Sequence, residues 1–101
     1  MLTIGLPFYN NEKTLADAIK SVLVQSYTDW ELILTDDGST DTSLSIANEF
    51  AKNDKRIIVI SDSINKGLSY RLNQIADMTT TRYLARMDAD DMMMPRKLKS
   101  R

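Results

Sequence analysis

The chain has 101 residues, with 13 basic and 14 acidic side chains and a formal net charge of −1. A chain of this length forms at most one domain, and its balanced charge creates no global field that would recruit nucleic acid or an anionic membrane. Because the sequence contains neither cysteine nor histidine, disulfide bonds, thiolate zinc sites and catalysis by Ser-His-Asp or Cys-His sets are excluded. Any metal must be held by oxygen ligands, which suit Mg²⁺, Mn²⁺ or Ca²⁺.

The beginning of the chain predicts a strand followed by a helix. Residues 2–6 alternate as a strand does, and Pro7 is expected to end that strand because proline cannot donate to a ladder. Apolar residues then recur with helical spacing over 15–23, which predicts a helix. Asn10 or Asn11 is expected to cap this helix.

The same order of strand and helix continues along the chain. Apolar runs predict strands at 30–35, 57–60 and 82–87, and helical patterns follow at 44–51 and 68–79. Consecutive β-branched residues at 57–60 are expected to be buried on both faces of a parallel sheet. The alternation predicts a right-handed α/β arrangement, a mostly parallel four-stranded sheet flanked by helices.

Polar segments follow the four predicted strands. They are residues 7–10, 36–39, 61–63 and 88–91. In an open parallel sheet the carboxyl ends of the strands share one edge, where ligands bind, so these segments are expected to converge. The three carboxylates within 88–91 repel one another unless a cation or hydrogen-bond donors lie between them, and a divalent metal would supply that cation. With only three glycines, neither a G-x-G-x-x-G fingerprint nor a Walker loop is possible, so bound phosphates would be held through a metal on the carboxylates.

Several segments of the sequence, in order, resemble the family two inverting glycosyltransferases of the GT-A fold, which use nucleotide-diphosphate sugars. They are residues 2–10, 32–41, 65–68 and 85–91, the last followed by Pro95. The resemblance spans essentially the whole chain. It implies that residues 1–101 are the Rossmann-like, nucleotide-sugar-binding half of a hexosyltransferase-type catalytic domain, with a UDP-sugar favoured as the donor.

The resemblance implies roles for matching positions. Tyr9 is similar to the aromatic residue that stacks on the nucleotide base, and Asp37 to the carboxylate that accepts a hydrogen bond from a uracil-like ring nitrogen. The segment 88–91 is similar to the D-x-D region, which contacts the ribose and holds Mn²⁺ or Mg²⁺ on the diphosphate. The implied nucleotide-binding residues are Pro7, Tyr9, Asn10, Asp36, Asp37, Lys66, Arg71, Asp88 and Asp90, and the implied metal ligands are Asp90 and Asp91.

The implied reaction is a direct displacement with inversion, in which an acceptor hydroxyl attacks the anomeric carbon. In the family the carboxylate base lies after the D-x-D region, so it is expected beyond residue 101. These residues are therefore expected to bind the donor and to transfer poorly or not at all. The implied partners are a nucleotide-sugar donor and a saccharide or lipid-linked acceptor. The protein is expected in the cytoplasm or at the inner face of the membrane, where it could associate peripherally. Self-association is expected through the fourth strand or residues 92–94.

Simpler interpretations exist for each motif. Residues 88–91 could be a solvated acidic turn that caps a further helix, which is expected to begin at Pro95, and residues 36–39 could be a turn with a helix cap. Tyr9 and Arg71 could be ordinary surface residues, and residues 65–67 could be a turn in which glycine supplies a positive φ. A different function is a receiver-like signalling domain or a nucleotide-binding interaction module. A receiver would need an acidic pair after its first strand, where this chain has none.

Overall fold

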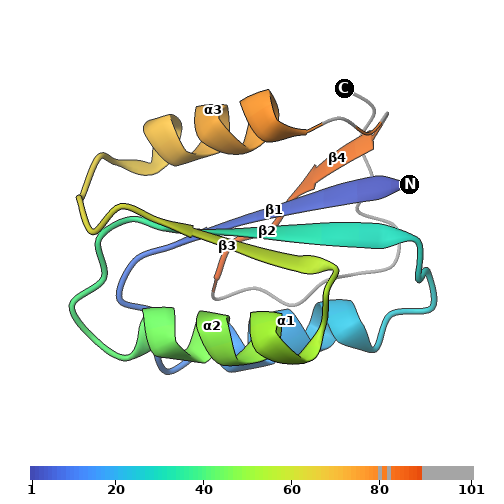
Figure 1. Ribbon diagram of the computed structural model, residues 1–101, viewed down its shortest axis with the longest axis horizontal. Helices are drawn as coiled ribbons and strands as arrows, with labels where there is room; N and C mark the ends of the chain where they lie inside the picture. Colours follow the sequence, from blue (N-terminus) through green and yellow to red (C-terminus); the bar gives the residue numbers. More distant parts are fainter. Residues whose placement is uncertain (80, 82, 90–101) are drawn as a thin grey trace.

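A computed structural model, which describes residues 1–79, 81 and 83–89, contains three helices and four strands in its described part (Figure 1). Within these ranges no helix combines the length and the apolar character that crossing a membrane requires. Each predicted strand and helix that falls inside the ranges is present, and the α/β fold class is confirmed. The elements are β1 (Leu2–Phe8), α1 (Leu15–Leu23), β2 (Trp30–Asp36), α2 (Ser43–Asn53), β3 (Ile57–Ser61), α3 (Leu68–Met78) and β4 (Tyr83–Arg86).

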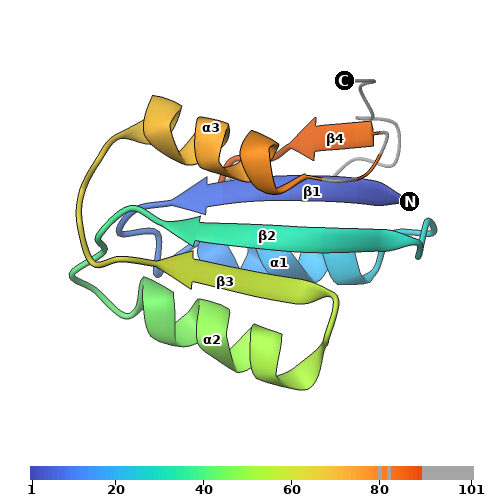
Figure 2. The same cartoon turned by 45° about the horizontal axis from the view of Figure 1, so that its top comes forward.

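The strands form one parallel sheet in the order β3-β2-β1-β4. Helices α1 and α2 lie on one face of the sheet and α3 lies on the other (Figures 1 and 2). The chain runs outward from β1 through β2 to β3, then crosses over the sheet to place β4 on the other side of β1. The order of the strands therefore reverses between β1 and β4, and ligands of open α/β sheets bind outside the carboxyl ends at such a point.

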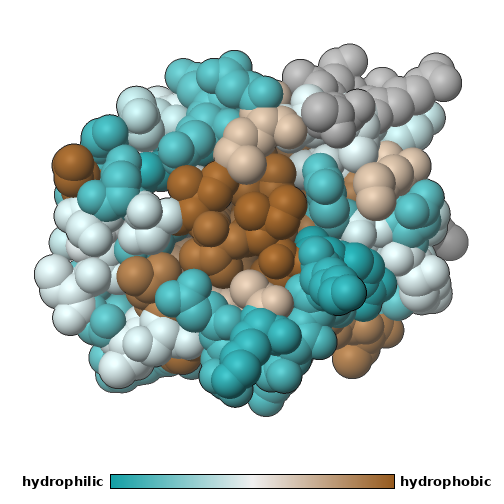
Figure 3. All heavy atoms as spheres, viewed as in Figure 1, coloured by the Kyte–Doolittle hydropathy of each residue, from teal (hydrophilic) through white to brown (hydrophobic). Residues whose placement is uncertain are grey.

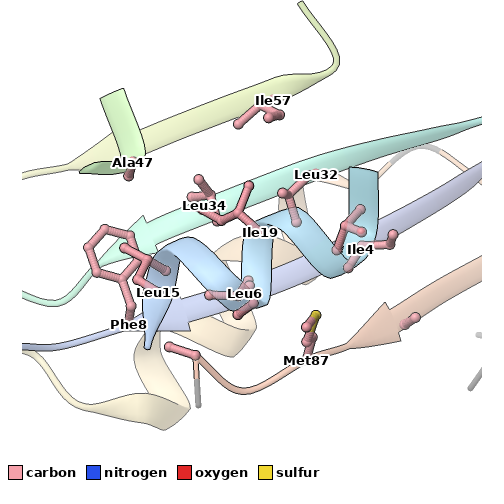
Figure 4. Close-up of a cluster of buried hydrophobic side chains, with 14 of the residues drawn as sticks. Ile4, Leu6, Phe8, Leu15, Ile19, Leu32, Leu34, Ala47, Ile57 and Met87 are labelled. Atoms are coloured by element: carbon pink, nitrogen blue, oxygen red, sulfur yellow. The ribbon is translucent and has the colours of Figure 1, made fainter. Parts of the chain in front are cut away.

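The main core lies between the sheet and helices α1 and α2 (Figure 4). Leu15, Ile19 and Val22 form one helical face because they are four and three residues apart, and all three are fully buried. They pack against alternate residues of the central strands, such as Leu6 and Leu34. Burying one such aliphatic side chain stabilises a fold by about 1.5 to 3 kcal/mol. This layer fixes the strands whose ends form the site.

The opposite face of β1 is shaped by Gly5. A Cβ atom at this position would lie 2.7 Å from Cγ2 of Ile75, which is buried in α3. The missing side chain therefore lets α3 pack directly on β1. This close approach brings the amino end of α3 toward the carboxyl ends of the strands.

The expectation that Pro7 ends the first strand is wrong, because β1 continues to Phe8. The carbonyl of Gly5 accepts a hydrogen bond from the N–H of Met87 on the β4 side, and the backbone of Pro7, two residues later, faces the same side. The described part of β4 pairs with β1 only as far as Gly5, so the missing N–H of Pro7 costs no ladder bond. On the other side, the carbonyl of Phe8 accepts from the N–H of Asp37 at 2.9 Å.

The predicted side-chain cap of α1 is also wrong. Thr14 is the N-cap residue, and it makes no side-chain capping hydrogen bond. The Asn10 side-chain oxygen instead accepts from the N–H of Thr40 at 2.8 Å, and the Asn11 side-chain oxygen accepts from the N–H of Tyr9 at 2.8 Å. Both asparagine side chains therefore stabilise the loop after β1, and the helix begins several residues later.

Strand β3 is not buried on both faces as predicted. Ile57 is 4% exposed and belongs to the core, but its neighbour Ile58 is 37% exposed. The reason is that β3 lies at the edge of the sheet, while α3 packs on β1 and β2 and leaves β3 uncovered on that face. Figure 3 shows the resulting apolar area over β3, between α3 and α2.

Candidate functional site

A cleft of about 220 Å³ opens where the strand order reverses. It lies between the carboxyl ends of β1 and β2, the segment after β4 and the amino end of α3. The lining residues are Pro7, Phe8, Tyr9, Asn11, Asp37, Leu68, Arg71, Asp88 and Ala89. The cleft thus brings together five of the residues singled out from the sequence, which are Pro7, Tyr9, Asp37, Arg71 and Asp88.

The end of β1 supplies an apolar wall with one aromatic ring. Pro7 is buried in the strand, whereas Tyr9 is 46% exposed just after the strand ends. The N–H of Tyr9 donates to the side chain of Asn11, which holds the turn that presents the ring. Leu68, the first residue of α3, is 49% exposed and lines the same cleft. A flat group could pack between such surfaces.

Asp37 connects the end of β2 with the beginning of α3. Its Oδ1 atom accepts three hydrogen bonds, from the N–H of Lys66 at 2.9 Å, the N–H of Gly67 at 3.1 Å and Nε of Arg71 at 2.9 Å. Its Oδ2 atom accepts one longer hydrogen bond, of 3.2 Å, from the same N–H of Gly67. Oδ1 therefore accepts more hydrogen bonds, and shorter ones, than Oδ2.

The pKa of Asp37 lies below its ordinary value. Burial alone would raise this pKa, because Asp37 is only 7% exposed and desolvation disfavours the charged carboxylate. The hydrogen bonds from Lys66, Arg71 and Gly67, together with the charge of Arg71, outweigh burial and lower the pKa. Asp37 is consequently ionised at neutral pH and acts only as a hydrogen-bond acceptor.

Arg71 is fully buried, contrary to its interpretation as an ordinary surface arginine. Besides Asp37, its guanidinium contacts Asp62, with distances of 2.8 Å from Nη2 to Oδ1 and 3.4 Å from Nη1 to Oδ2. It also donates to the side-chain oxygen of Gln74 at 3.2 Å and to the carbonyl of Ile64. The hydrogen bonds that Arg71 donates to Asp62 raise the pKa of Arg71, although burial alone would lower it. All three guanidinium nitrogens thus have partners within the protein.

Lys66, Asp36 and Asn10 do not line the cleft. The ammonium group of Lys66 lies 3.1 Å from Asp62, and only its backbone reaches Asp37. Asp36 is 1% exposed, and its two oxygens accept from the N–H of Ser39 and the hydroxyl of Ser61, both at 2.9 Å. These contacts connect the loops, as the turn interpretation of residues 36–39 expects. Nucleotide-binding roles for the three residues stay predictions.

The acidic segment after β4 is described only in part. Asp88 lines the cleft, and its Oδ1 lies 3.1 Å from Nη2 of Arg86. Asp90 and Asp91, on which the metal prediction rests, lie outside the described residues, as does the helix expected after Pro95. Among the residues that the structure does describe, no three carboxylates gather in a way that could hold a metal ion.

Four lining residues were not predicted individually as binding residues: Phe8, Asn11, Leu68 and Ala89. Phe8 and Ala89 nevertheless lie within segments 7–10 and 88–91, which were expected to converge at this edge of the sheet. Leu68 belongs to the segment 65–68, and an apolar residue exposed at the first position of a helix indicates a contact surface. The structure also shows that Asp62 contacts Arg71, as the predicted convergence of the loops at this edge allows.

Comparison with known proteins identifies the family. The sequence model described as "Glycosyl transferase family 2" matches residues 3–100. This chain belongs to glycosyl transferase family 2. Among family 2 relatives, EpsE of Bacillus subtilis (strain 168), which carries a provisional glycosyltransferase assignment, is 45% identical over 98 residues. The match covers 96% of this chain and 35% of EpsE.

Two further comparisons extend the family 2 assignment. WfgD of Escherichia coli is 35% identical over 98 residues, covering 97% of this chain and 38% of that protein. It is named as a UDP-Glc:alpha-D-GlcNAc-diphosphoundecaprenol beta-1,3-glucosyltransferase. Residues 1–349 of TarS from S. aureus, in complex with UDP-GlcNAc, superpose with a TM-score of 0.84 at 25% identity, covering 93% of this chain and 28% of that one. The chain therefore has the GT-A fold and spans about a third of the length of these relatives.

Proposed function

We propose that this chain is the donor-binding part of an inverting glycosyltransferase whose cleft holds a nucleotide-diphosphate sugar, with a UDP-sugar preferred. The observation that carries this proposal is the unequal use of Asp37. Its Oδ1 accepts three hydrogen bonds, whereas its Oδ2 accepts only the 3.2 Å contact from Gly67. An ionised carboxylate with an oxygen that can accept a further hydrogen bond suits a ring N–H such as N3–H of uracil.

The walls of the cleft support the placement of a base there. Tyr9 and Leu68 are both about half exposed and line the same cleft as Asp37 and Pro7. Stacking of a base on an aromatic side chain contributes about 1 to 3 kcal/mol to binding. Structures of the relative TarS in complex with UDP and with UDP-GlcNAc support the choice of uridine. In this proposal Asp88 and Asp90 lie toward the ribose.

A divalent metal, Mn²⁺ or Mg²⁺, is proposed to bind at Asp90 and Asp91. The support is chemical: three carboxylates lie within four residues of a chain that has no nitrogen or sulfur ligand from histidine or cysteine. When bound, such a cation would offset the charge that develops on the departing nucleoside diphosphate. The carboxylates of this segment would hold and orient it.

Sugar transfer is proposed to occur by direct displacement. The acceptor hydroxyl attacks the anomeric carbon and gives its proton to a carboxylate base, while the nucleoside diphosphate leaves from the opposite face. Of the described residues that line the cleft, Asp37 is hydrogen-bonded with a lowered pKa and Asp88 pairs with Arg86, so neither suits this task. We propose that a residue after the acidic segment 88–91 supplies this base, and that residues 1–101 bind the donor without efficient transfer.

The acceptor is proposed to be a saccharide, free or lipid-linked, at the cytoplasmic face of the membrane. The name of WfgD, which specifies a diphosphoundecaprenol-linked acceptor, supports this class. A lipid-linked acceptor would also explain peripheral membrane association of the whole protein and a role in making polysaccharides. We also propose that the protein self-associates through the fourth strand or residues 92–94.

Calorimetry with the 101-residue chain tests the proposed function. UDP, GDP and ADP are titrated with and without Mn²⁺, and UDP is expected to bind most tightly when the metal is present. Asp37→Asn is expected to weaken UDP binding by about 10- to 100-fold, because a hydrogen bond to a charged group contributes about 1.5 to 3 kcal/mol. Thermal unfolding of each variant shows whether its fold is retained.

The matched control is Asp54→Asn. Asp54 is also paired with an arginine, at 2.7 Å from Nη2 of Arg56, but it precedes β3 at the end of the sheet opposite the cleft. This variant is expected to bind UDP as the wild type does. If no nucleotide binds more tightly with Mn²⁺ than without it, and Asp37→Asn binds UDP normally, the donor-site proposal is wrong.

A further inference from the structure

The guanidinium group of Arg71 is shared between two carboxylates. Its outer end, Nη1 and Nη2, donates two hydrogen bonds to Asp62, of 3.4 and 2.8 Å. Of the guanidinium nitrogens, only Nε donates a hydrogen bond to Asp37, at 2.9 Å. Gln74 and the carbonyl of Ile64 accept further hydrogen bonds from the same outer end. Arg71 therefore meets Asp37 through a single nitrogen, although arginine commonly binds a carboxylate through two.

This division leaves Oδ2 of Asp37 with only the 3.2 Å hydrogen bond from the N–H of Gly67, so this oxygen can accept a further one. We propose that Asp62 is a positioning residue that draws the outer end of Arg71 away from Asp37 and so keeps this oxygen available to the nucleotide base. The inference rests on the proposed function, because it gives Asp62 a role in the recognition of the ring N–H by Asp37. Asp62 itself does not line the cleft.

Asp62 is itself held in place. Its Oδ1 accepts from the N–H of Ile64 at 3.1 Å, and its Oδ2 lies 3.1 Å from Nζ of Lys66. Ser63, which lies between Asp62 and Ile64, has a φ of 61°, in the left-handed region of backbone conformation. The contacts from Arg71 and Lys66 lower the pKa of Asp62, which is therefore ionised at neutral pH.

Because Arg71 is buried, its guanidinium is expected to turn to Asp37 when the charge of Asp62 is removed. A fully buried guanidinium must find partners within the protein, because an unpaired buried charge is strongly destabilising. If Asp62 loses its charge, the remaining carboxylate in contact with Arg71 among the described residues is Asp37. The guanidinium is then expected to bind Asp37 through two nitrogens, which would occupy Oδ2.

Simple electrostatics predicts the opposite effect. Removing a negative charge near the binding site of a diphosphate should tighten binding of the anion, since like charges repel. The positioning role instead predicts weaker binding, and only for ligands that use the ring N–H. The sign of the change therefore separates the two explanations.

The experiment compares UDP with N3-methyl-UDP, which lacks the ring N–H. Affinities of the 101-residue chain for both are measured by calorimetry in the presence of Mn²⁺. The wild type is expected to prefer UDP by about 10-fold or more, and Asp62→Asn to reduce that ratio to below about 3-fold by weakening UDP alone. Asp62→Glu, which keeps the charge, is expected to retain most of the preference, and Asp54→Asn all of it. Asp62→Ser tests the same expectation if Asp62→Asn does not fold.

The outcomes distinguish this inference from the proposed function. If the wild type prefers UDP and a folded Asp62→Asn or Asp62→Ser variant keeps that preference, the positioning role is wrong while the donor site stands. If the wild type binds both nucleotides equally, the proposed contact of Asp37 with the base is wrong, and the role of Asp62 is wrong with it.

Discussion

Gly38 and Gly67 both have a positive φ, but replacing them with alanine is expected to lower the stability of the fold by different amounts. Gly38 has a φ of 80°, and a Cβ there would lie 2.8 Å from the backbone atoms of both Asn65 and Ile64. Gly67 has a φ of 94°, but a Cβ there would meet nothing within 4 Å. Gly38 thus combines backbone strain with a backbone clash, whereas Gly67 has strain alone.

Gly38→Ala is therefore expected to lower the free energy of unfolding by about 3 kcal/mol or more, and Gly67→Ala by about 1 to 2 kcal/mol. Urea unfolding of the two variants measures the difference. Equal losses of stability in the two variants would show that the loop containing Ile64 and Asn65 moves away from residue 38 without cost. The close contact with Gly38 would then not determine the path of that loop.

At the level of single residues, the sequence predicts a site residue best where a strand fixes its position. Tyr9 and Asp37 come soon after the predicted strands and directly after β1 and β2, and both line the cleft. The role inferred for Asp62 was not predictable, because its contact with Arg71 depends on the path of the loop between β3 and α3. The uses of Asn10 and Asn11 depend in the same way on a neighbouring loop.

At the level of elements, the periodicity of apolar residues predicts each strand and helix but not the order of strands in the sheet. Burial on both faces, expected for residues 57–60, requires a central strand, whereas β3 lies at the edge. Similarly, Pro7 is tolerated in β1 because the described β4 pairs with β1 only as far as Gly5. Both errors concern which neighbour a strand has, and this information lies in long-range packing.

The edge position of β3 predicts unequal effects for two adjacent isoleucines. Ile57 is 4% exposed within the core, while Ile58 is 37% exposed on the face that α3 leaves open. Ile57→Ala is expected to lower the free energy of unfolding by about 2 to 4 kcal/mol, since it removes buried methyl groups and leaves a cavity. Ile58→Ala is expected to cost less than about 1 kcal/mol.

Chemical unfolding of these two variants, made in the same strand and by the same substitution, provides an internal comparison. A loss at Ile58 as large as that at Ile57 would mean that the outer face of β3 is covered in solution. The concentration dependence of the transition would then show whether a second copy of the chain provides that cover.

For the whole molecule, the lowered pKa values of several aspartates connect folding with pH. Hydrogen bonds and arginine or lysine partners lower the pKa of Asp37, Asp54 and Asp62 from the ordinary value of 3.8. Hydrogen bonds from Ser43 and Glu12 outweigh desolvation to do the same for Asp41. A carboxyl with a lower pKa in the folded state than in the unfolded state contributes stability above the unfolded pKa. It loses that contribution as pH falls through the folded pKa.

The free energy of unfolding is therefore expected to change little between pH 7 and about pH 5 and to fall steadily as the pH is lowered below the ordinary value of 3.8. Asp54→Asn removes one of these carboxyls, whose hydrogen bond with Arg56 is the largest cause of its lowered pKa. The variant is expected to be less stable at pH 7, and its loss of stability on acidification is expected to be smaller than that of the wild type. Urea unfolding at a series of pH values measures how the free energy of unfolding of each protein changes with pH. Parallel curves for the two proteins would show that the ion pair of Asp54 does not persist in solution, because a carboxyl without a lowered pKa contributes no dependence on pH.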